Sequence, residues 1–409
     1  MSSISSLAGS HLKLIGYGEN NLGKENKAMV YVTIGAAPVY HQMSLEEFLF
    51  GAFENKTLVS QSVGGTRTYE LDHISPRLRK ALDCEALLTK LKEFNASTES
   101  LRRVDRHSLY HTFLIPKKSG GMRRINAPND DLKLALRNLK AMLESDFKCL
   151  YHTAAHAYVR ERSVVTAMRV HQSNESKWFA KLDLHDFFGS TTLEFVMRQF
   201  SMIYPFCELV KIDSGYTELK KALELGFLDG GLPQGTPLSP IITNVMMIPI
   251  DFKLSKALRE KRGFAFTRYA DDFQISSKFD FDIKEIVALV KNTLGSFGAP
   301  FSLNEKKTRY GSSSGRNWNL GLMLNKDNQL TVGRKRIRQF QNLVYRFITD
   351  ASNGSPWDRS DVQVLHGQYS YYRMVEKDTI DRIITHIDQK MDVDVVKKML
   401  EAMAQPTTI

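Results

Sequence analysis

The sequence predicts an α+β protein in which strand hairpins alternate with amphipathic helices. One hairpin is expected over 264–276, with short strands on either side of Asp271-Asp272, and another over 110–125 around a glycine-containing turn. From 333 to about 403 the chain is basic and mostly helical in pattern. Apolar residues at helical spacing predict further helices over 75–94, 130–144 and 283–294.

Size and composition predict an ordinary globular protein. With 409 residues, 42% of them hydrophobic, the chain has room for two or three domains and a large core. No apolar run approaches the roughly 18 residues of a membrane span, and the first residues lack the features of a signal peptide. Cys84, Cys149 and Cys207 lie far apart without metal-ligand spacing. We therefore expect a cytoplasmic protein with no membrane partner.

The net charge of +11 is unevenly distributed along the chain. Residues 1–100 hold 10 Lys and Arg against 11 Asp and Glu, whereas the rest of the chain holds 46 against 34. The basic excess therefore lies entirely after residue 100, which favours contact of that part with a polyanion. Charge that only keeps the protein soluble is the alternative explanation.

The pair Asp271-Asp272 is expected at the turn of the 264–276 hairpin. Two neighbouring carboxylates on a rigid turn repel each other unless a cation lies between them. Mg²⁺ suits such a site because it takes hard oxygen ligands from one or two carboxylates and from substrate phosphates. An isolated Asp-Asp pair is also compatible with a solvated turn, so the prediction depends on further ligands.

Asp183 supplies a third carboxylate. It lies in a predicted strand otherwise filled by Phe179, Leu182 and Leu184. An ionised carboxylate in such an apolar strand is costly unless a cation or hydrogen bonds compensate it. Because Asp183 precedes Asp271 by 88 positions, only the fold can bring the two together.

Two other segments have unusual compositions. The segment 230–240 contains three glycines, three prolines and Gln234, which predicts a loop that approaches a flat ligand such as a base pair. A helix is expected to follow, with Ser239 as N-cap and Pro240 as its first residue. The 110–125 hairpin carries cations that could close over a triphosphate or simply face solvent: Lys117, Lys118, Arg123 and Arg124.

Taken together, these segments resemble the palm and fingers of reverse transcriptases. Asp183-Leu-His-Asp-Phe-Phe188 resembles the first catalytic block of that family, Leu232–Pro240 its template-primer loop, and Tyr269-Ala-Asp-Asp272 its catalytic tetrapeptide. The blocks follow each other in the family's order over 110–325. The resemblance implies a right-hand polymerase fold with fingers, a palm built from an antiparallel sheet and helices, and a helical thumb.

The resemblance also implies a division of the chain into domains. Residues 1–100 would form an N-terminal extension of unknown role, and 101–180 the fingers. The palm would span 181–325, with part of the fingers around 200–230, and the helical thumb would span 326–409. Residues 301–308 are expected to form a short strand and loop, and 317–324 a further strand.

Carried over residue by residue, the resemblance implies that Asp183, Asp271 and Asp272 bind two Mg²⁺ ions, for which Mn²⁺ could substitute. The carbonyl of Leu184 would join the second metal. One metal would activate the primer 3′-OH, and the other would hold the triphosphate and its leaving group. Lys307 would donate a proton to the leaving pyrophosphate.

Further roles follow from the same resemblance. Lys117 and Arg123 would grip the phosphates of the incoming nucleotide, and Asp186 and Gln234 would lie beside it. Phe188 would screen the sugar 2′-OH and so favour dNTPs over rNTPs. Contacts to primer or template are implied for Gly235, Tyr269, Leu320 and Gly321.

Within the family, the chain resembles the bacterial branch of retron, group II intron and defence-associated enzymes, through 117–125 and Asp186-Phe-Phe188. Two elements depart from retron enzymes. Asn319-Leu-Gly321 stands where Val-Thr-Gly is typical, and Thr166–His171 only approximates Asn-Ala-x-x-His. About 80 residues after the palm leave no room for the extra segments of an intron maturase, and no segment resembles RNase H or an integrase.

These features imply a stand-alone bacterial enzyme that makes cDNA from a dedicated noncoding RNA, uses dNTPs and serves antiphage defence, as a monomer or an oligomer. One alternative is a retron enzyme that makes self-primed or branched DNA. Another is a catalytically silent RNA-binding protein on a polymerase scaffold. The presence of all three acids and Gln234 counts against the silent scaffold.

Overall fold

The computed structural model describes side chains for residues 84–404, except 118–119, 148–150, 262 and 314–320, together with five strands between 13 and 70. These five strands form an antiparallel sheet in the order β1-β2-β3-β4-β5. Their bounds are Lys13–Glu19, Lys27–Ile34, Ala37–Ser44, Thr57–Ser62 and Gly65–Glu70. Within the described part of the chain, no helix is both long and apolar enough to cross a membrane.

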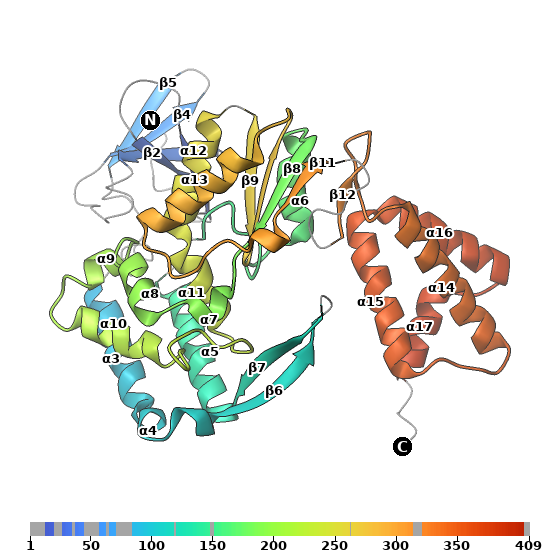
Figure 1. Cartoon of the computed structure of the whole chain (residues 1–409), viewed down its shortest axis with the longest axis horizontal. Helices are drawn as coiled ribbons and strands as arrows, with labels where there is room; N and C mark the ends of the chain where they lie inside the picture. Colours follow the sequence, from blue (N-terminus) through green and yellow to red (C-terminus); the bar gives the residue numbers. More distant parts are fainter. Residues whose placement is uncertain are drawn as a thin grey trace.

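A four-stranded antiparallel sheet lies at the centre of the molecule (Figure 1). Its strand order is β11-β8-β10-β9, so the hairpin β9–β10 pairs with a strand that lies far upstream in the sequence. Consecutive residues along β8, β9 and β10 are buried, so both faces of this sheet are covered. The strands are β8 (Trp178–Asp183), β9 (Phe264–Tyr269), β10 (Asp272–Ser277) and β11 (Arg309–Ser312).

Different helices cover the two faces of this central sheet. On one face Leu182, Phe273 and Ile275 join the main core with side chains of α11, α12 and α13. On the other face Phe179 packs against α6 and the short hairpin β12–β13. The elements are α6 (Val164–Ser173), α11 (Ser239–Met246), α12 (Ile248–Glu260), α13 (Ile283–Ser296), β12 (Met323–Leu324) and β13 (Leu330–Thr331).

A helical subdomain with a projecting hairpin lies beside the sheet (Figure 1). In the hairpin, β6 (Tyr110–Pro116) pairs with β7 (Met122–Pro128) along their whole length. Helix α5 follows directly because Asn129 caps it, its side chain accepting a 2.9 Å bond from the Leu132 amide. The helices are α3 (Cys84–Ser97), α4 (Glu99–Arg102), η3 (Arg106–Leu109), α5 (Asp130–Ser145), α7 (Phe187–Ser190), α8 (Leu193–Phe200), α9 (Phe206–Leu209) and α10 (Gly215–Glu224).

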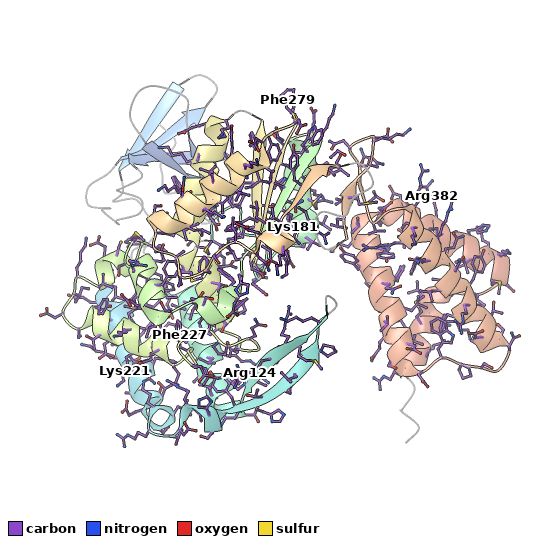
Figure 2. All side chains as sticks on the ribbon, in the orientation of Figure 1. Arg124, Lys181, Lys221, Phe227, Phe279 and Arg382 are labelled. Carbon is purple, nitrogen blue, oxygen red and sulfur yellow. The ribbon has the colours of Figure 1, made fainter. Side chains whose placement is uncertain are left out.

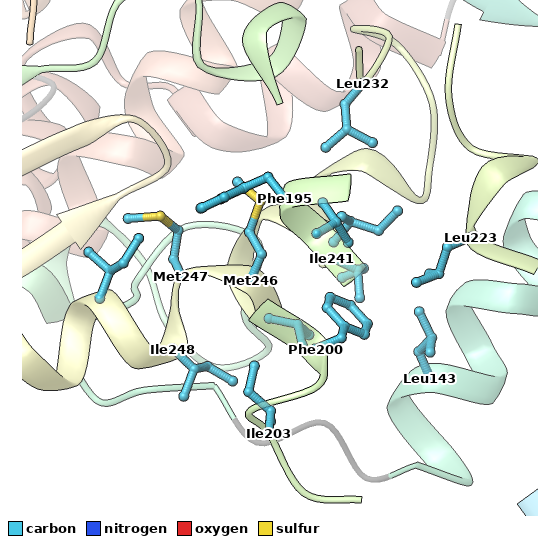
Figure 3. Packing of buried hydrophobic residues seen from close by; sticks show 14 of the residues in the cluster. Leu143, Phe195, Phe200, Ile203, Leu223, Leu232, Ile241, Met246, Met247 and Ile248 are labelled. Atoms are coloured by element: carbon cyan, nitrogen blue, oxygen red, sulfur yellow. The ribbon is translucent and has the colours of Figure 1, made fainter. Parts of the chain in front are cut away.

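The main core joins this subdomain to the central sheet. Figure 3 shows Phe195 and Phe200 of α8 beside Ile241 and Met246 of α11, with Leu143 of α5 close by. All five side chains are at most 2% exposed. Burying a side chain of this size contributes about 1.5–3 kcal/mol, so α11, which continues the 230–240 segment, is held firmly in place.

One buried side chain in this core is expected to destabilise it. Gln199 of α8 is fully buried, and neither atom of its amide has a hydrogen-bond partner. We expect Gln199→Leu to raise the free energy of unfolding by about 1–2 kcal/mol, because it removes an unpaired polar group at similar volume. Urea unfolding of both proteins measures this, with Gln199→Ala expected to destabilise. A Leu variant less stable than wild type would contradict the prediction.

The C-terminal helices form a separate bundle with its own core (Figure 1). The hairpin β12–β13 is bonded to both the bundle and α6. On the side of the bundle, Glu376 accepts hydrogen bonds from the Thr331 hydroxyl at 2.7 Å and the Val332 amide at 2.8 Å. On the side of α6, the side-chain amides of Gln172 and Asn328 each donate to the other residue's backbone carbonyl at 2.8 Å. The helices are α14 (Arg334–Ser352), α15 (Arg359–Val375), α16 (Lys377–Met391) and α17 (Val395–Ala404).

The structure corrects three local predictions. The strand β7 includes Pro128, whose missing N–H costs nothing at the last position of the strand. Helix α11 begins at Ser239 itself, whose amide donates to the Thr236 hydroxyl, so Ser239 is not the N-cap. Residues 301–308 contain the 3₁₀ turn η4 (Glu305–Lys307) instead of a strand, and only Leu303 makes an isolated bridge.

Two other predictions are tested only in part. In the 75–94 segment the helix is described from Cys84 onward, and 75–83 lie outside the described residues. Most of the strand expected over 317–324 also lies outside them, and the described part contains β12 alone. Helix α3 packs Leu87 and Leu91 into the main core, so the last part of residues 1–100 packs with the segments that follow.

Candidate active site

The three acids predicted from the sequence meet at one end of the central sheet. Asp183 is the last residue of β8 and Asp272 the first of β10, and the antiparallel register pairs them directly. Asp271 lies in the turn just before β10, where its carbonyl accepts a 3.1 Å bond from the Leu184 amide. Pairing of β8 with β10 therefore brings together carboxylates that are 88 positions apart.

Two lysines partly neutralise these acids. The ammonium of Lys307 lies 3.0 and 2.9 Å from the two carboxylate oxygens of Asp183, and that of Lys181 lies 2.6 Å from Asp272 Oδ2. Lys181 follows the period of two along β8, so it shares a face with Asp183. Lys181 is labelled on the central sheet in Figure 2. Over the described ranges, no three Asp, Glu, His or Cys side chains form a ready-made metal cluster.

Burial and mutual repulsion disfavour ionisation of the pair on the turn. The pKa of Asp271 is raised to about 6. Burial is the largest cause, and the neighbouring charges of Asp272 and Asp183 add to it. Burial also raises the pKa of Asp272, against the opposing effect of Lys181. Carboxyl groups that ionise more readily when a cation is near are suited to bind a divalent metal ion, which takes hard oxygen ligands.

The raised pKa of Asp271 makes stability depend on pH. The Asp271 carboxyl binds a proton more tightly in the folded state than in the unfolded state. Its protonation therefore stabilises the folded state at low pH, and this stabilisation is lost as pH rises through about 6. We expect Asp271→Asn to stabilise the metal-free protein at pH 8 by about 3 kcal/mol. The gain should shrink as pH falls below 6. Thermal unfolding in chelator measures it, and a less stable variant at pH 8 would contradict it.

A buried polar network holds the turn that carries Asp271, which we call the catalytic turn after its expected role. Arg268 is fully buried, and its Nε and Nη2 donate to Asp251 of α12 at 2.7–3.0 Å. Its Nη1 donates to Asn244 Oδ1 at 3.2 Å and to the Ala270 carbonyl at 3.1 Å. Ala270 has a left-handed φ of 58°, which is unfavourable for alanine. The network therefore stabilises the backbone conformation that presents Asp271.

The 230–240 loop packs against the hairpin β6–β7. The Gln234 carbonyl accepts a 2.8 Å bond from the Asn126 amide. At Gly235 φ is +112°, and a Cβ there would lie 2.8 Å from Ile125 Cγ2, so only glycine fits. Arg124 of the hairpin, labelled in Figure 2, lies 3.9 Å from the carboxylate of Asp229 at the loop entrance.

The residues expected to bind a nucleotide lie on three different elements. Lys117 and Arg123 are exposed near the tip of the hairpin β6–β7, and Asp186 is exposed at the start of α7. Phe188 is half-buried, and its carbonyl accepts a 2.9 Å bond from Leu232, which links α7 to the loop that carries the half-buried Gln234. No described contact brings the hairpin tip to the acids.

The residues expected to contact primer or template are only partly described. Tyr269 ends β9 and packs, half-buried, against the cluster that includes α6 and β12–β13. The Gly321 carbonyl accepts a 2.9 Å bond from Arg336 of α14, and a Cβ at Gly321 would collide with that guanidinium. Leu320, the fourth residue, lies outside the described residues.

Sequence reasoning missed several residues of this site. Lys181 could have been found, because a lysine two positions before a buried strand carboxylate points to the same face. Asp229-Gly230 is a turn signal, and Asp229 indeed has a φ of 52°. Arg268 and Asp251 carried no such signal, because their pairing depends on the packing of α12 against β9.

Comparison with known proteins identifies the family. The family model for reverse transcriptase (RNA-dependent DNA polymerase) matches residues 115–340, more than half of the chain. The chain belongs to the reverse transcriptase family. This reverse transcriptase is 32% identical to the retron Ec73 reverse transcriptase of Escherichia coli over 246 residues, which cover 58% of this chain and 73% of that protein. With the E. coli retron Ec83 enzyme it shares 27% identity over 287 residues, or 67% and 85% of the two chains.

Family membership confirms the central expectations. The protein is an RNA-directed DNA polymerase of the retron-like branch, and its α+β architecture is the right-hand polymerase fold. Members of this family use divalent metal ions and an RNA template. A solved telomerase structure from Candida albicans matches at a TM-score of 0.41 and 11% identity, covering 86% of this chain and 69% of that one.

Proposed function

We propose that this reverse transcriptase copies a dedicated noncoding RNA into cDNA in the bacterial cytoplasm, at a two-metal site formed by Asp183, Asp271 and Asp272. The observation that carries the site is the direct pairing of Asp183 with Asp272 beside Asp271 at the end of the sheet. The raised pKa values of Asp271 and Asp272 support a cationic partner. We infer Mg²⁺, for which Mn²⁺ could substitute, because all of the donors are hard oxygens.

The surrounding residues suit nucleotidyl transfer. Bound metal ions would activate the primer 3′-OH and neutralise charge on the triphosphate. Asp183, Asp271, Asp272 and the Leu184 carbonyl would hold the ions. Lys307 is bonded to Asp183, and release from that pair would leave its ammonium free to protonate the leaving pyrophosphate.

The nucleotide would lie between the hairpin β6–β7 and the 230–240 loop. Lys117 and Arg123 would contact its phosphates, which requires the hairpin tip to approach the acids. Phe188 would lie under the sugar, with Gln234 and Asp186 on either side. The bond between the Asn126 amide and the Gln234 carbonyl supports this arrangement, because it couples the hairpin to the loop.

The division of the chain into domains, with the bounds given from the sequence, is part of this proposal. Residues 101–180, with the helices around 200–230, would be the fingers, 181–325 the palm and 326–409 the thumb. Gly235, Tyr269 and Gly321 would line the path of primer and template, together with Leu320. The separate core of α14–α17 supports an independent thumb.

The sequence similarity to retron enzymes favours the retron alternative over other defence-associated enzymes. In that case the product would be a short DNA of fixed sequence, copied from part of the RNA. The motif departures at Thr166–His171 and Asn319–Gly321 would then be variations within the branch. A role in antiphage defence is part of the proposal and rests on the family resemblance alone.

Sequencing of co-purified nucleic acids tests the proposal. Wild type and the Asp271→Asn/Asp272→Asn variant are each expressed with their native flanking DNA, and bound RNA and DNA are sequenced. We expect one defined RNA with both proteins and complementary DNA with the wild type only. DNA without an RNA complement would contradict templated synthesis, and DNA with both proteins would contradict the metal assignment. Phage plating on the same strains tests the defence role.

A further inference from the structure

The loop that precedes α6 runs beside the catalytic turn. Ala155 forms a parallel bridge with Arg268. The Arg268 amide donates to the Ala154 carbonyl at 2.6 Å, and the His156 amide donates to the Arg268 carbonyl at 2.9 Å. Both segments advance in the same direction from this bridge. Three residues further on, they reach Tyr158 and Asp271 respectively.

The same buried network fixes the backbone just before both residues. Asn244 donates to the Ala157 carbonyl at 2.8 Å, and Arg268 donates both to Asn244 and to the Ala270 carbonyl. The peptide before Tyr158 and the peptide before Asp271 are therefore held by one pair of side chains. This arrangement sets the position of Tyr158 relative to the catalytic turn.

Tyr158 has an unfavourable conformation and an exposed side chain. Its φ is 59°, in the left-handed region that large side chains rarely adopt. Its side chain is nevertheless 51% exposed, whereas the four preceding residues, 154–157, are buried. Backbone strain that the surrounding structure enforces is concentrated at functional sites, and packing of the ring does not explain it here.

The charges that act on the phenol come from three parts of the site. Burial of its protein-facing part raises the pKa of Tyr158, the charges of Asp271 and Tyr269 raise it further, and Arg123 lowers it. Asp271 belongs to the catalytic turn, Tyr269 ends β9, and Arg123 lies on the hairpin β6–β7. The exposed ring is therefore close to the point where a primer end and an incoming nucleotide would meet.

We propose that Tyr158 is a primer-contacting residue whose exposed ring packs against the 3′-terminal nucleotide of the primer, next to Asp271. An aromatic ring suits this role because every base offers a face for stacking, so the contact is independent of sequence. The strained backbone keeps the ring at the catalytic turn before the primer arrives. The proposal rests on the assignment of Asp271 to the reaction centre.

Binding of primer and template tests the proposal without chemistry. The full chain, freed of co-purified nucleic acid, is titrated into a fluorescent DNA primer on an RNA template, without dNTP, and anisotropy is measured. We expect Tyr158→Ala to raise the dissociation constant about 5- to 150-fold, the range for loss of one stacked base. Tyr158→Phe keeps the ring and should bind within about twofold of wild type.

A second variant separates the ring from the backbone. Asparagine tolerates the left-handed conformation, so Tyr158→Asn should fold at least as stably as wild type and still lose binding as alanine does. If Tyr158→Asn bound primer and template as tightly as wild type, the proposal would be overturned. It would also be overturned if the Tyr158 variants raised only the KM for dNTP and left primer-template binding unchanged. Phe279→Ala is the control, because Phe279 is 71% exposed beyond the opposite end of β10 (Figure 2).

The two assignments can fail separately. If Asp271→Asn/Asp272→Asn still incorporated dNTPs, the metal assignment would be wrong. The binding data for the Tyr158 variants would still show whether Tyr158 contacts primer and template. If the acid variant is inactive but all Tyr158 variants bind primer and template normally, only the role of Tyr158 is rejected.

Discussion

Replacing Asp272 with asparagine is expected to lower the rate of dNTP incorporation at least about 1,000-fold. We propose Asp272 as a metal ligand, and such a ligand contributes several kcal/mol of transition-state stabilisation, each 1.4 kcal/mol being tenfold. Asp272 begins β10 opposite Asp183, and asparagine has the same shape, so the fold should persist. Single-turnover extension of a DNA primer on an RNA template measures the effect in saturating Mg²⁺.

A matched control comes from the same chain. Asp213 is exposed in the segment between α9 and α10, and Asp213→Asn should extend the primer at the wild-type rate. If Asp272→Asn kept more than about a tenth of that rate, a loss below 1.4 kcal/mol, the carboxylate could not be a ligand of an essential metal.

Removing one partner of the buried Arg268–Asp251 pair will cost about 3–5 kcal/mol of stability, because it leaves an uncompensated charge in the core. Both side chains are fully buried, and Nη2 and Oδ2 are 2.7 Å apart. Asp251→Asn and Arg268→Met should each lower the urea midpoint strongly. DNA synthesis should fall as well, because Arg268 also donates to the Ala270 carbonyl beside Asp271.

The double variant Arg268→Met/Asp251→Leu separates the two effects. Replacing a buried ion pair with apolar residues is often neutral for stability, so we expect much of the lost stability to return. Activity should stay low, because the Ala270 carbonyl and Asn244 still lack their donor. A stable double variant with wild-type activity would show that Arg268 serves stability alone.

The predictions from sequence were most accurate where chemistry and strand pattern agreed. The hairpin that flanks Asp271-Asp272 and the strand that ends at Asp183 were both predictable, because aromatic and aliphatic residues are frequent in these short segments. Their pairing could not be derived from pattern, since 88 positions separate Asp183 from Asp271. The sequence predicted only that the fold brings the acids together, and the register of β8 and β10 does so.

The residues that support the acids were harder to predict. A buried arginine in β9 has no pattern of its own, and Asp251 on α12 resembles a solvated helix residue until the helix packs against the sheet. Tyr158 was not predicted because its segment has neither helical nor strand periodicity. Its position depends on the bridge between Ala155 and Arg268, which is a tertiary contact.

Direct measurement of bound metal tests the central claim most directly. Mn²⁺ binding is measured by electron paramagnetic resonance, in the presence of an RNA template, a DNA primer lacking its 3′-OH and the matching dNTP. Two Mn²⁺ ions that bind to wild type and are lost in Asp183→Asn and Asp272→Asn are the expected result. Equal binding by wild type and both variants would contradict a metal site formed by these three acids.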